Sequence, residues 1–274
     1  MSDGARFAFG DNWMEFLSVV DEQRIGQAER SLVAMLGKNR LDGMSFCDVG
    51  SGSGLFSLAA RRLGAKVVSF DFDPTSVACT AELRRRFFPE DPDWRVERGS
   101  ALDREYLQGL GRFDVVYAWG VLHHTGQMWR AMKLVATLVR PGGSLWLAIY
   151  NDQGWPSAAW RQVKRAYNAT PKALRFLIVA PVFARLWGPT VLRDLARGRP
   201  LATWFHYRSS RGMSARHDLI DWVGGFPFEV ARPDDVIGFF ARLGLGFELR
   251  EVVRRTGIGC NEFLFARTSA GLPD

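Results

Sequence analysis

The sequence has few cysteines, and their arrangement argues against two classes of protein. Only Cys47, Cys79 and Cys260 occur among 274 residues, an odd number without a Cys-x-x-Cys pair. A disulfide scaffold and a cysteine-based zinc site are therefore not expected. Residues 1–12 lack the apolar stretch of a secretion signal, and no apolar run approaches the ~20 residues that span a bilayer. These absences predict a reduced, cytoplasmic protein.

Acidic residues are scarce in one segment, between Arg161 and Arg216. Twelve lysines and arginines lie there, opposed by Asp194 alone, whereas the net charge of the whole chain is only +7. The basic character therefore belongs to this segment, and the remainder of the chain is slightly acidic.

Short apolar runs alternate with helix-like periodicity from residue 44 to residue 150. The expected strands are 44–49, 66–70, 94–98, 113–119 and 144–150, and the expected helices are 11–36, 56–63, 74–86 and 128–139, with a turn at Pro141–Gly143. Such alternation predicts a parallel sheet covered by helices on both faces. In these sheets, ligands bind at the carboxyl ends of the strands.

The alternation stops after Tyr150 and resumes near residue 233. A helix at 234–243 is expected there, followed by strands at 246–255 and 260–268 that form a hairpin. The predicted fold is a doubly wound, mostly parallel seven-stranded α/β sheet, Rossmann-like, with an antiparallel last strand. The predicted organisation is an N-terminal helical lid (1–43), a catalytic core (44–150 and 233–270) and a basic α-helical cap inserted at 151–232. Pro181 and Pro189 are expected to divide the apolar part of this insert into short helices.

A glycine loop follows the first strand, in the sequence Asp48-Val49-Gly50-Ser51-Gly52-Ser53-Gly54. Glycines allow a tight turn and a close approach of the backbone to a ligand, and the next helix presents free N–H groups. A dinucleotide fingerprint requires glycine at position 55, where this chain has leucine. The second strand ends at Asp71, seventeen positions after Gly54, where a carboxylate can accept hydrogen bonds from both hydroxyls of a ribose.

These features resemble the successive motifs of class I S-adenosylmethionine-dependent methyltransferases. The resemblance covers residues 44–150 and is supported by the terminal hairpin. It implies that S-adenosylmethionine is bound by Asp48, Gly50, Ser51, Gly52, Gly54, Asp71, Phe72, Ser100, Ala101 and Trp119. Asp48, Gly50 and Trp119 would lie near the methionine moiety, Asp71 would hold the ribose, and Phe72, Ser100 and Ala101 would flank the adenine.

The segment Trp119–His124, Trp-Gly-Val-Leu-His-His, is similar to small-molecule methyltransferases, including the ubiquinone-pathway type. The chain lacks the Asn/Asp-Pro-Pro-Tyr/Phe signature of enzymes that methylate exocyclic amines. His124 is the first candidate for a base or substrate contact and His123 the second, because imidazole titrates near neutral pH. A structural role for either histidine is the alternative. The four histidines lack a metal-binding spacing, and no metal is predicted.

Two further regions contribute candidates. Aromatics ahead of the first helix, including Trp13, could close over the cofactor, or could simply pack on the domain. In the insert, His206, Tyr207, Arg211 and His217 are candidates for substrate binding, although solvated or locally bonded side chains are the alternative.

Three functions of the basic insert are considered. It could cap the substrate pocket and bind an acidic acceptor, lie on an anionic membrane and admit a lipid-like acceptor, or bind nucleic acid. Its apolar content and the absence of a recognisable RNA module favour the first two, while a structural cap remains the plain alternative. The function expected is methyl transfer to an oxygen, nitrogen or sulfur of a small or lipid-like acceptor. RNA methylation and a non-catalytic cofactor-binding subunit are the alternatives, and no oligomeric state is predicted.

Overall fold

The structure is a computed structural model that describes residues 17, 20–205, 215–257 and 259–269. Trp13, His206, Tyr207 and Arg211 lie outside the described residues, and of His217 only the backbone is described.

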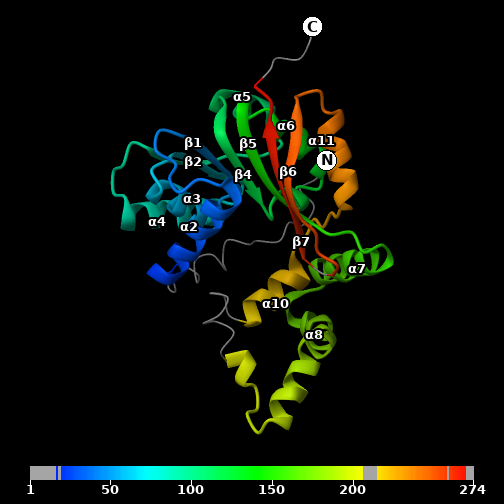
Figure 1. Ribbon diagram of the computed structural model, residues 1–274. Coiled ribbons are helices and arrows are strands. Elements are labelled where there is room, and N and C mark those ends of the chain that lie inside the picture. The colour runs from blue at the N-terminus through cyan, green and yellow to red at the C-terminus, as the bar shows by residue number, and fades with distance from the viewer. Residues whose placement is uncertain (1–16, 18–19, 206–214, 258, 270–274) are drawn as a thin grey trace.

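A seven-stranded sheet forms the centre of the molecule, with the strand order β3-β2-β1-β4-β5-β7-β6 (Figure 1). The strands are β1 (Ser45–Val49), β2 (Lys66–Asp71), β3 (Trp94–Arg98), β4 (Phe113–Trp119), β5 (Val139–Tyr150), β6 (Phe247–Val253) and β7 (Cys260–Arg267). Strands β1 to β5 pair in parallel, and β7 lies antiparallel between β5 and β6. The predicted doubly wound sheet with an antiparallel last strand is therefore confirmed, as is its terminal hairpin.

Helices cover both faces of this sheet. They are α2 (Glu22–Leu36), α3 (Leu55–Arg62), α4 (Pro74–Phe87), α5 (Arg104–Leu110), α6 (Met128–Ala136) and α11 (Pro233–Arg242), with a 3₁₀ turn η1 (Leu122–His124) after β4. Alternation along β4 explains the layering, because Val115 and Tyr117 join one apolar core with α2 and α3, while Val116 and Ala118 join the other. Residues that alternate along a strand face opposite sides of the sheet.

Carboxylate caps begin the two helices that follow β2 and β3. Asp73 Oδ1 accepts a hydrogen bond from Thr75 N at 2.8 Å, and Pro74 occupies the first turn of α4. Asp103 Oδ1 accepts from Tyr106 N at 3.1 Å and starts α5, a helix that the sequence pattern did not predict. Such caps satisfy N–H groups that have no partner within the helix.

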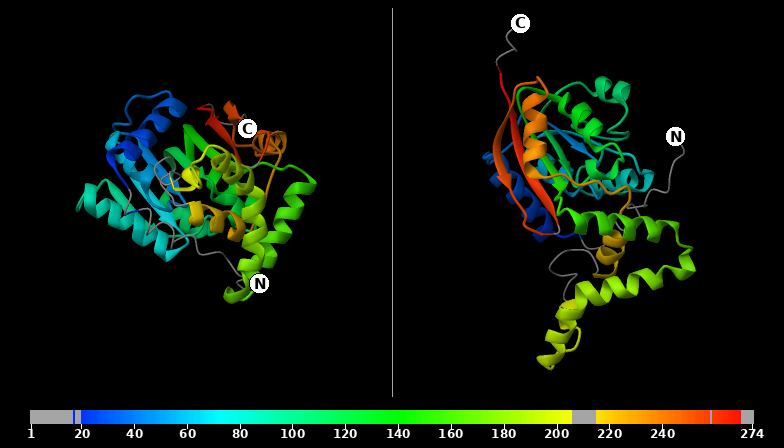
Figure 2. Two further views of the ribbon diagram at one scale, coloured as in Figure 1. Left: turned by 90° about the horizontal axis from the view of Figure 1, so that it is seen from below. Right: turned by 90° about the vertical axis from the view of Figure 1, so that its right-hand side faces the viewer.

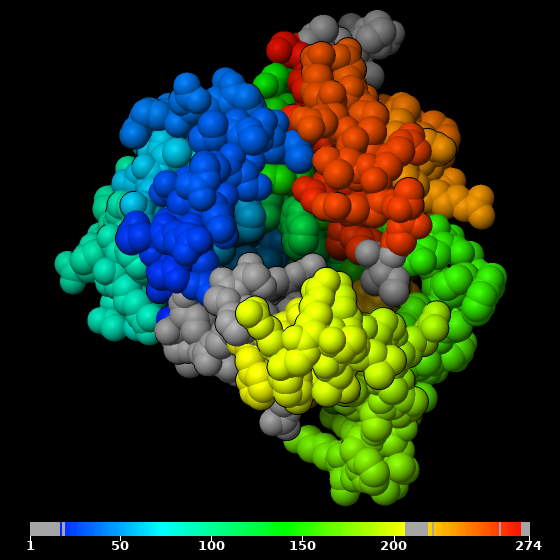
Figure 3. Space-filling model, turned by 60° about the horizontal axis from the view of Figure 1, so that its bottom comes forward, coloured from blue at the N-terminus to red at the C-terminus, as the bar shows by residue number. Residues whose placement is uncertain are grey.

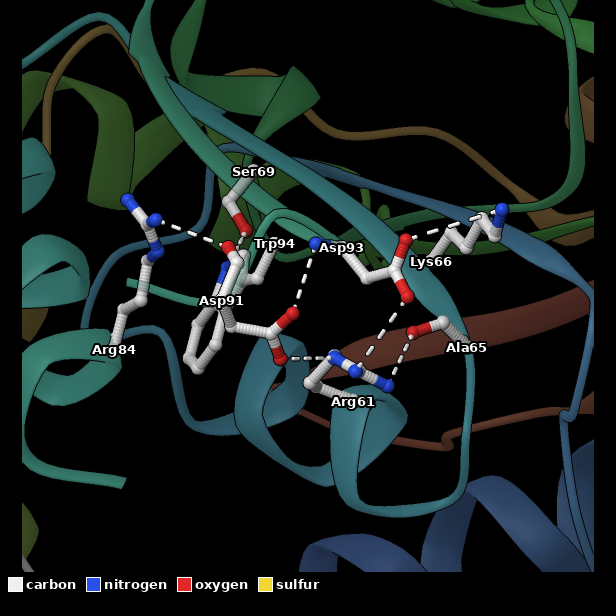
Figure 4. Close-up of polar contacts among 8 residues, drawn as sticks. All are labelled: Arg61, Ala65, Lys66, Ser69, Arg84, Asp91, Asp93 and Trp94. Carbon is white, nitrogen blue, oxygen red and sulfur yellow. Dashed lines mark hydrogen bonds and ion pairs between the residues drawn. The ribbon is translucent and has the colours of Figure 1, made fainter. Parts of the chain in front are cut away.

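An ion-pair network ties α3 to the loop that leads into β3 (Figure 4). Arg61 Nε donates to Asp91 Oδ2 at 2.7 Å and lies 3.7 Å from Asp93, while Arg84 donates to the Asp91 carbonyl oxygen. Both the Arg61 and Asp91 side chains are less than a fifth exposed. The network fixes the outer edge of the sheet, remote from the carboxyl ends of β4 and β5.

The predicted turn at Pro141–Gly143 is wrong, because these residues lie within β5. Val139 already pairs with Phe113, and the register then shifts between Phe113 and Val115. This irregularity absorbs the turn-like residues without ending the strand.

The insert consists of α7 (Trp155–Ala169), the 3₁₀ turn η2 (Lys172–Leu174), α8 (Phe176–Ala196) and α10 (Ala215–Gly224). It lies at the carboxyl ends of the parallel strands, and α8 with residues 197–205 projects away from the sheet (Figures 1 and 2). A small apolar core of Tyr167, Val182, Leu219 and Val223 joins its helices.

Two expectations for α8 are corrected. Pro181 and Pro189 lie inside one continuous helix and do not divide it. Each proline removes a hydrogen bond to the carbonyl four residues earlier, at Leu177 and Arg185, and both of these residues are exposed to water. The segment Lys172–Ala196 is also long and apolar enough to cross a membrane, contrary to the expectation that no such run exists.

Candidate functional site

The glycine loop after β1 is held by the end of β2. Gly50 N and Ser51 N donate to the Phe70 carbonyl oxygen at 2.8 and 3.1 Å, and Gly52 N donates to Asp71 Oδ2 at 3.0 Å. Ser51 Oγ also lies 2.9 Å from Thr80 Oγ1 of α4. The loop is therefore fixed by backbone and side-chain bonds of its neighbours.

Two glycines in this loop leave no space for a side chain. Gly50 has φ +73°, and a Cβ atom there would lie 2.2 Å from Val121 Cγ2. Gly54 caps α3 with φ +79°, and a Cβ atom would lie 2.9 Å from Thr80 Cγ2. Both positions combine a left-handed backbone with close packing, which explains why the loop requires glycine.

Asp71 lies at the carboxyl end of β2, beside the loop. One carboxylate oxygen accepts from Gly52 N and the other from Asp73 N, at 3.0 and 2.9 Å. Burial raises the pKa of Asp71, although these N–H groups oppose the shift. Each oxygen retains a further lone pair, so the carboxylate can still accept hydrogen bonds from a ligand.

Asp48 is almost fully buried beneath the loop. Its carboxylate accepts from Ser57 Oγ, which in turn accepts from Ser69 Oγ, and Ser69 Oγ accepts from Trp94 Nε1. Burial raises the pKa of Asp48 to about 7, with a further contribution from the charge of Asp71, while the bond from Ser57 opposes the rise. These contacts give Asp48 a part in positioning the loop, and its contact with a methionine amine stays a prediction.

The residues expected around an adenine ring follow β2 and β3. Gly99 N donates to the Asp71 carbonyl oxygen at 3.0 Å, which brings Ser100 and Ala101 beside the end of β2. Phe72 is 45% exposed, and the Arg98 guanidinium lies 6.0 Å from its ring centre. Ala101 is buried, and Ser100 Oγ accepts from Leu102 N. The edge thus combines an exposed aromatic ring with small side chains.

His124 is oriented by a turn returning from the insert. Its Nδ1 lies 2.7 Å from the Pro227 carbonyl oxygen, which can only accept, so Nδ1 carries a proton. Burial lowers the pKa of His124 to about 3, although the bond to Pro227 opposes the shift. The ring is therefore neutral at pH 7, and Nε2 is its unprotonated nitrogen.

His123 is fully buried and makes different contacts. Its Nδ1 accepts from Tyr150 N at 3.4 Å, while its Nε2 has no hydrogen-bond partner among the described residues. Burial lowers its pKa well below the usual value. Because His123 is buried, it is suited to supporting the sheet edge at the carboxyl ends of the strands. A contact between His123 and a ligand stays a prediction.

An aromatic cluster that the sequence reasoning missed surrounds the two histidines. The Tyr150 ring lies 4.0 Å from His123, 5.5 Å from His124 and 5.3 Å from Phe228, measured between ring centres. Trp222 of α10 contacts Tyr150 from the insert. The sequence could have pointed to Tyr150 only through its position, because Tyr150 ends a strand at the sheet edge where ligands are expected to bind.

Lys164 of α7 links the insert to this aromatic cluster. The side chain is fully buried, its Nζ donates to the Trp222 carbonyl oxygen, and Nζ lies 4.8 Å from the Phe228 ring centre. The positive charge of Lys164 contributes to keeping both histidines neutral. The insert therefore shapes the electrostatics at the end of β4.

The sheet edge that carries these groups is hollowed (Figure 3). The hollow is bordered by the blue atoms of α2, the orange-red atoms of the last strands and the yellow atoms near residue 200, with the sheet in its floor. Trp119, at the end of β4, is 44% exposed. A large aromatic side chain thus remains accessible at this edge.

Comparison with known proteins identifies the family. A family model described as a methyltransferase domain matches residues 20–210. Ubiquinone biosynthesis O-methyltransferases from Xanthomonas campestris pv. campestris (strain B100) and Xanthomonas oryzae pv. oryzae (strain PXO99A) are each 31% identical, over 167 and 170 residues, or 60% of this chain. The chain spans only 61–62% of the length of these relatives.

Solved structures share the fold at low identity. Magnesium protoporphyrin IX methyltransferase from Synechocystis PCC 6803, with bound SAH, aligns with a TM-score of 0.51 and 16% identity over 98% of this chain and 90% of its own. A solved structure from Methanococcus maripaludis aligns with a TM-score of 0.52 and 11% identity over the whole of both chains. With the family match, the strand order and the glycine loop, the chain belongs to the class I S-adenosylmethionine-dependent methyltransferases.

Proposed function

We propose that this protein transfers a methyl group from S-adenosylmethionine to a hydroxyl oxygen of a small, largely apolar acceptor. The observation that carries the proposal is the glycine loop locked onto Asp71, on the same sheet edge as His124. The relatives in ubiquinone biosynthesis are O-methyltransferases, which supports an oxygen acceptor and a lipid-like molecule.

The residues at this edge fit the cofactor. Asp71 has acceptor capacity for the two ribose hydroxyls, since a carboxylate offers about four lone pairs and the N–H groups of Gly52 and Asp73 use one on each oxygen. Phe72, Ser100 and Ala101 would flank the adenine ring, with Phe72 supplying the exposed aromatic face. Gly50, Ser51, Gly52 and Gly54 would let the backbone approach the ligand, and Trp119 would lie at the methionine end. Asp48 would support the loop from below.

The bound cofactor supplies a methyl group made electrophilic by its sulfonium. The protein must then hold the acceptor in line with that methyl group, and such positioning is a large part of catalysis. His124 is suited to this task, because the Pro227 carbonyl fixes its tautomer, in which Nε2 is the ring nitrogen that can accept a hydrogen bond.

The lowered pKa of His124 remains compatible with proton removal. A neutral hydroxyl is a weak acid, but an oxygen that is gaining a methyl group becomes a strong acid. A histidine with a pKa of about 3 can therefore accept the proton late in the transfer. His123 and Tyr150 would hold the His124 ring in place through the aromatic contacts around it.

A labelled methyl donor tests the proposal. The purified protein would be incubated with S-adenosylmethionine labelled in the methyl group and with extracted small molecules, RNA or no acceptor. Label in organic-soluble products, stable to ester hydrolysis and released as methyl iodide by ether cleavage with hydriodic acid, is expected. Label in RNA alone, or label in no product while the cofactor binds, would contradict the proposed function.

A further inference from the structure

The outer face of α8 exposes apolar side chains that the described residues leave uncovered. Leu177, Leu192 and Leu195 share this side of the helix and are 52–68% exposed. Six of the eleven large apolar side chains counted as exposed in the described chain lie between residues 174 and 205. This concentration in a projecting segment distinguishes α8 from a scatter of single surface residues.

The opposite face of α8 is already occupied. Ile178, Val179, Val182, Phe183 and Leu186 pack against the small core shared with α7 and α10. The outer apolar face is therefore additional to what the insert needs for its own packing. Figure 2 shows α8 and residues 197–205 standing clear of the sheet, so the described part of the sheet and its helices does not cover this segment.

Charge on the same segment favours an anionic partner. Residues 161–205 contain nine lysines and arginines and one acid, Asp194. The Asp194 carboxylate accepts from Thr203 N and Thr203 Oγ1, at 2.8 and 2.9 Å, so it serves the local fold. Arg185 is exposed on the same side of α8 as Leu192, seven residues later, and Arg193 is exposed near the end of the helix. Apolar side chains bordered by arginines match the interface of an anionic bilayer.

The arrangement suits a helix that lies on the bilayer. The segment Lys172–Ala196 has the length and apolar character of a membrane span, and only 6% of its apolar window is buried. However, Arg185 occupies the middle of α8, and one side of the helix is packed on the insert. A central arginine is costly in a bilayer core but is favourable at the headgroups.

We propose that the outer face of α8 docks the protein on membranes that contain anionic phospholipids. The apolar side chains enter the headgroup region, and the arginines contact lipid phosphates. Docking would bring the insert and the sheet edge behind it to the membrane surface. The inference is independent of the methyl acceptor, because it rests on α8 alone.

Vesicle sedimentation with the full-length protein tests the proposal. Vesicles of phosphatidylcholine would be compared with vesicles that also contain phosphatidylglycerol, at low and high salt. The wild type is expected to sediment with the anionic vesicles and to be released by salt. The double variant Leu177→Gln/Leu192→Gln should bind about tenfold more weakly or worse, and Arg185→Gln should weaken binding to anionic vesicles alone.

Trp155→Gln is the matched control, because Trp155 is 82% exposed and lies at the start of α7. It should bind vesicles as the wild type does. Retained binding of S-adenosylhomocysteine would show that each variant is folded and keeps this test separate from the methyl-transfer test. Failure of the wild type to bind anionic vesicles, or equal binding by the double variant, would overturn the proposal. So would a wild-type dimer that the double variant dissociates, because a second copy would then cover α8.

Discussion

Along the strands of the sheet, apolar side chains alternate between two cores, and helices cover both of these cores. In α8, apolar side chains occur on two sides of the helix, but only one side packs against the small core of the insert. Trp94 and Trp146 are almost completely buried in the sheet, while Phe176 and Leu192 are more than half exposed in the insert. The two regions therefore use apolar residues for different purposes. Burial against the sheet stabilises the fold, while exposure along α8 leaves a surface for another component.

Polar groups differ between the two regions in the same way. At the sheet edge, Asp48 and Asp71 are buried or half-buried and bonded to named partners, which fixes their geometry. In the insert, Arg185 and Arg193 are exposed side chains on a projecting helix. The first pattern suits recognition of one small molecule in one orientation, and the second suits a diffuse anionic surface. Four substitutions in the core test the first half of this contrast.

The largest effect is expected from His124→Gln. If the imidazole orients and deprotonates the acceptor as proposed, its removal should lower kcat by about 100-fold or more, with little change in binding of S-adenosylhomocysteine. Steady-state kinetics and calorimetry would measure the two quantities. Because the pKa of His124 is about 3, its protonation should not reduce the rate between pH 8 and pH 5. An unchanged kcat in the variant would remove His124 from the reaction.

Asp71→Ala should weaken binding of S-adenosylhomocysteine by about 100-fold, because charge-assisted bonds to two hydroxyls are lost. The change in tryptophan fluorescence on titration would measure the dissociation constant. Asp42→Ala is the control, since Asp42 is an exposed carboxylate that pairs with Arg40. Equal affinity of both variants would show that the end of β2 does not hold the ribose.

Gly50→Ala should lower the free energy of unfolding by about 3 kcal/mol, because a left-handed backbone and an overlap with Val121 are both penalised. Gly37→Ala separates the two causes. Gly37 also has a positive φ, but a Cβ atom there would meet nothing within 4 Å. It should cost about 1 kcal/mol, and urea unfolding would measure both variants. Equal costs would mean that the packing of the loop against Val121 contributes nothing.

The smallest effect is expected at the outer edge of the sheet. Burial raises the pKa of Asp91, but bonds from Arg61 and Asp93 N outweigh it and hold the pKa below the usual value. Arg61→Gln should therefore lower the free energy of unfolding by about 2 kcal/mol at pH 7. This stabilisation is complete above the ordinary carboxylate pKa and is lost as the pH falls through the lowered value.

Urea unfolding at pH 7 and near pH 2 would measure this difference. Arg40→Gln is its control, because the exposed pair with Asp42 should contribute little to the free energy of unfolding. A difference between wild type and Arg61→Gln that persists unchanged at low pH would show that the ion pair is not its source.

The sequence predicted the parts of the site that depend on local chemistry. Glycines at positions 50, 52 and 54 and the carboxylate at Asp71 follow strands whose apolar pattern is clear, so their place on one edge followed from the topology of parallel sheets. The roles of individual residues at this edge stay predictions.

Contacts between segments that lie far apart in the chain could not be predicted from the sequence. The Pro227 carbonyl meets His124 across 103 positions of chain, and Ser57 meets Asp48 from the far side of the glycine loop. Neither contact has a local pattern, because each depends on how packed elements face one another. Pro181 and Pro189 show a related difficulty, since the rule that proline ends a helix depends on whether the freed carbonyls can reach water.

The most direct measurement is a calorimetric titration of S-adenosylhomocysteine into the wild-type protein. The account predicts saturable binding at one site per chain, and it predicts that Asp71→Ala reduces the affinity whereas Leu177→Gln/Leu192→Gln does not. Absence of binding by the folded wild type, or equal binding by the Asp71→Ala variant, would contradict the assignment of the cofactor to the loop after β1.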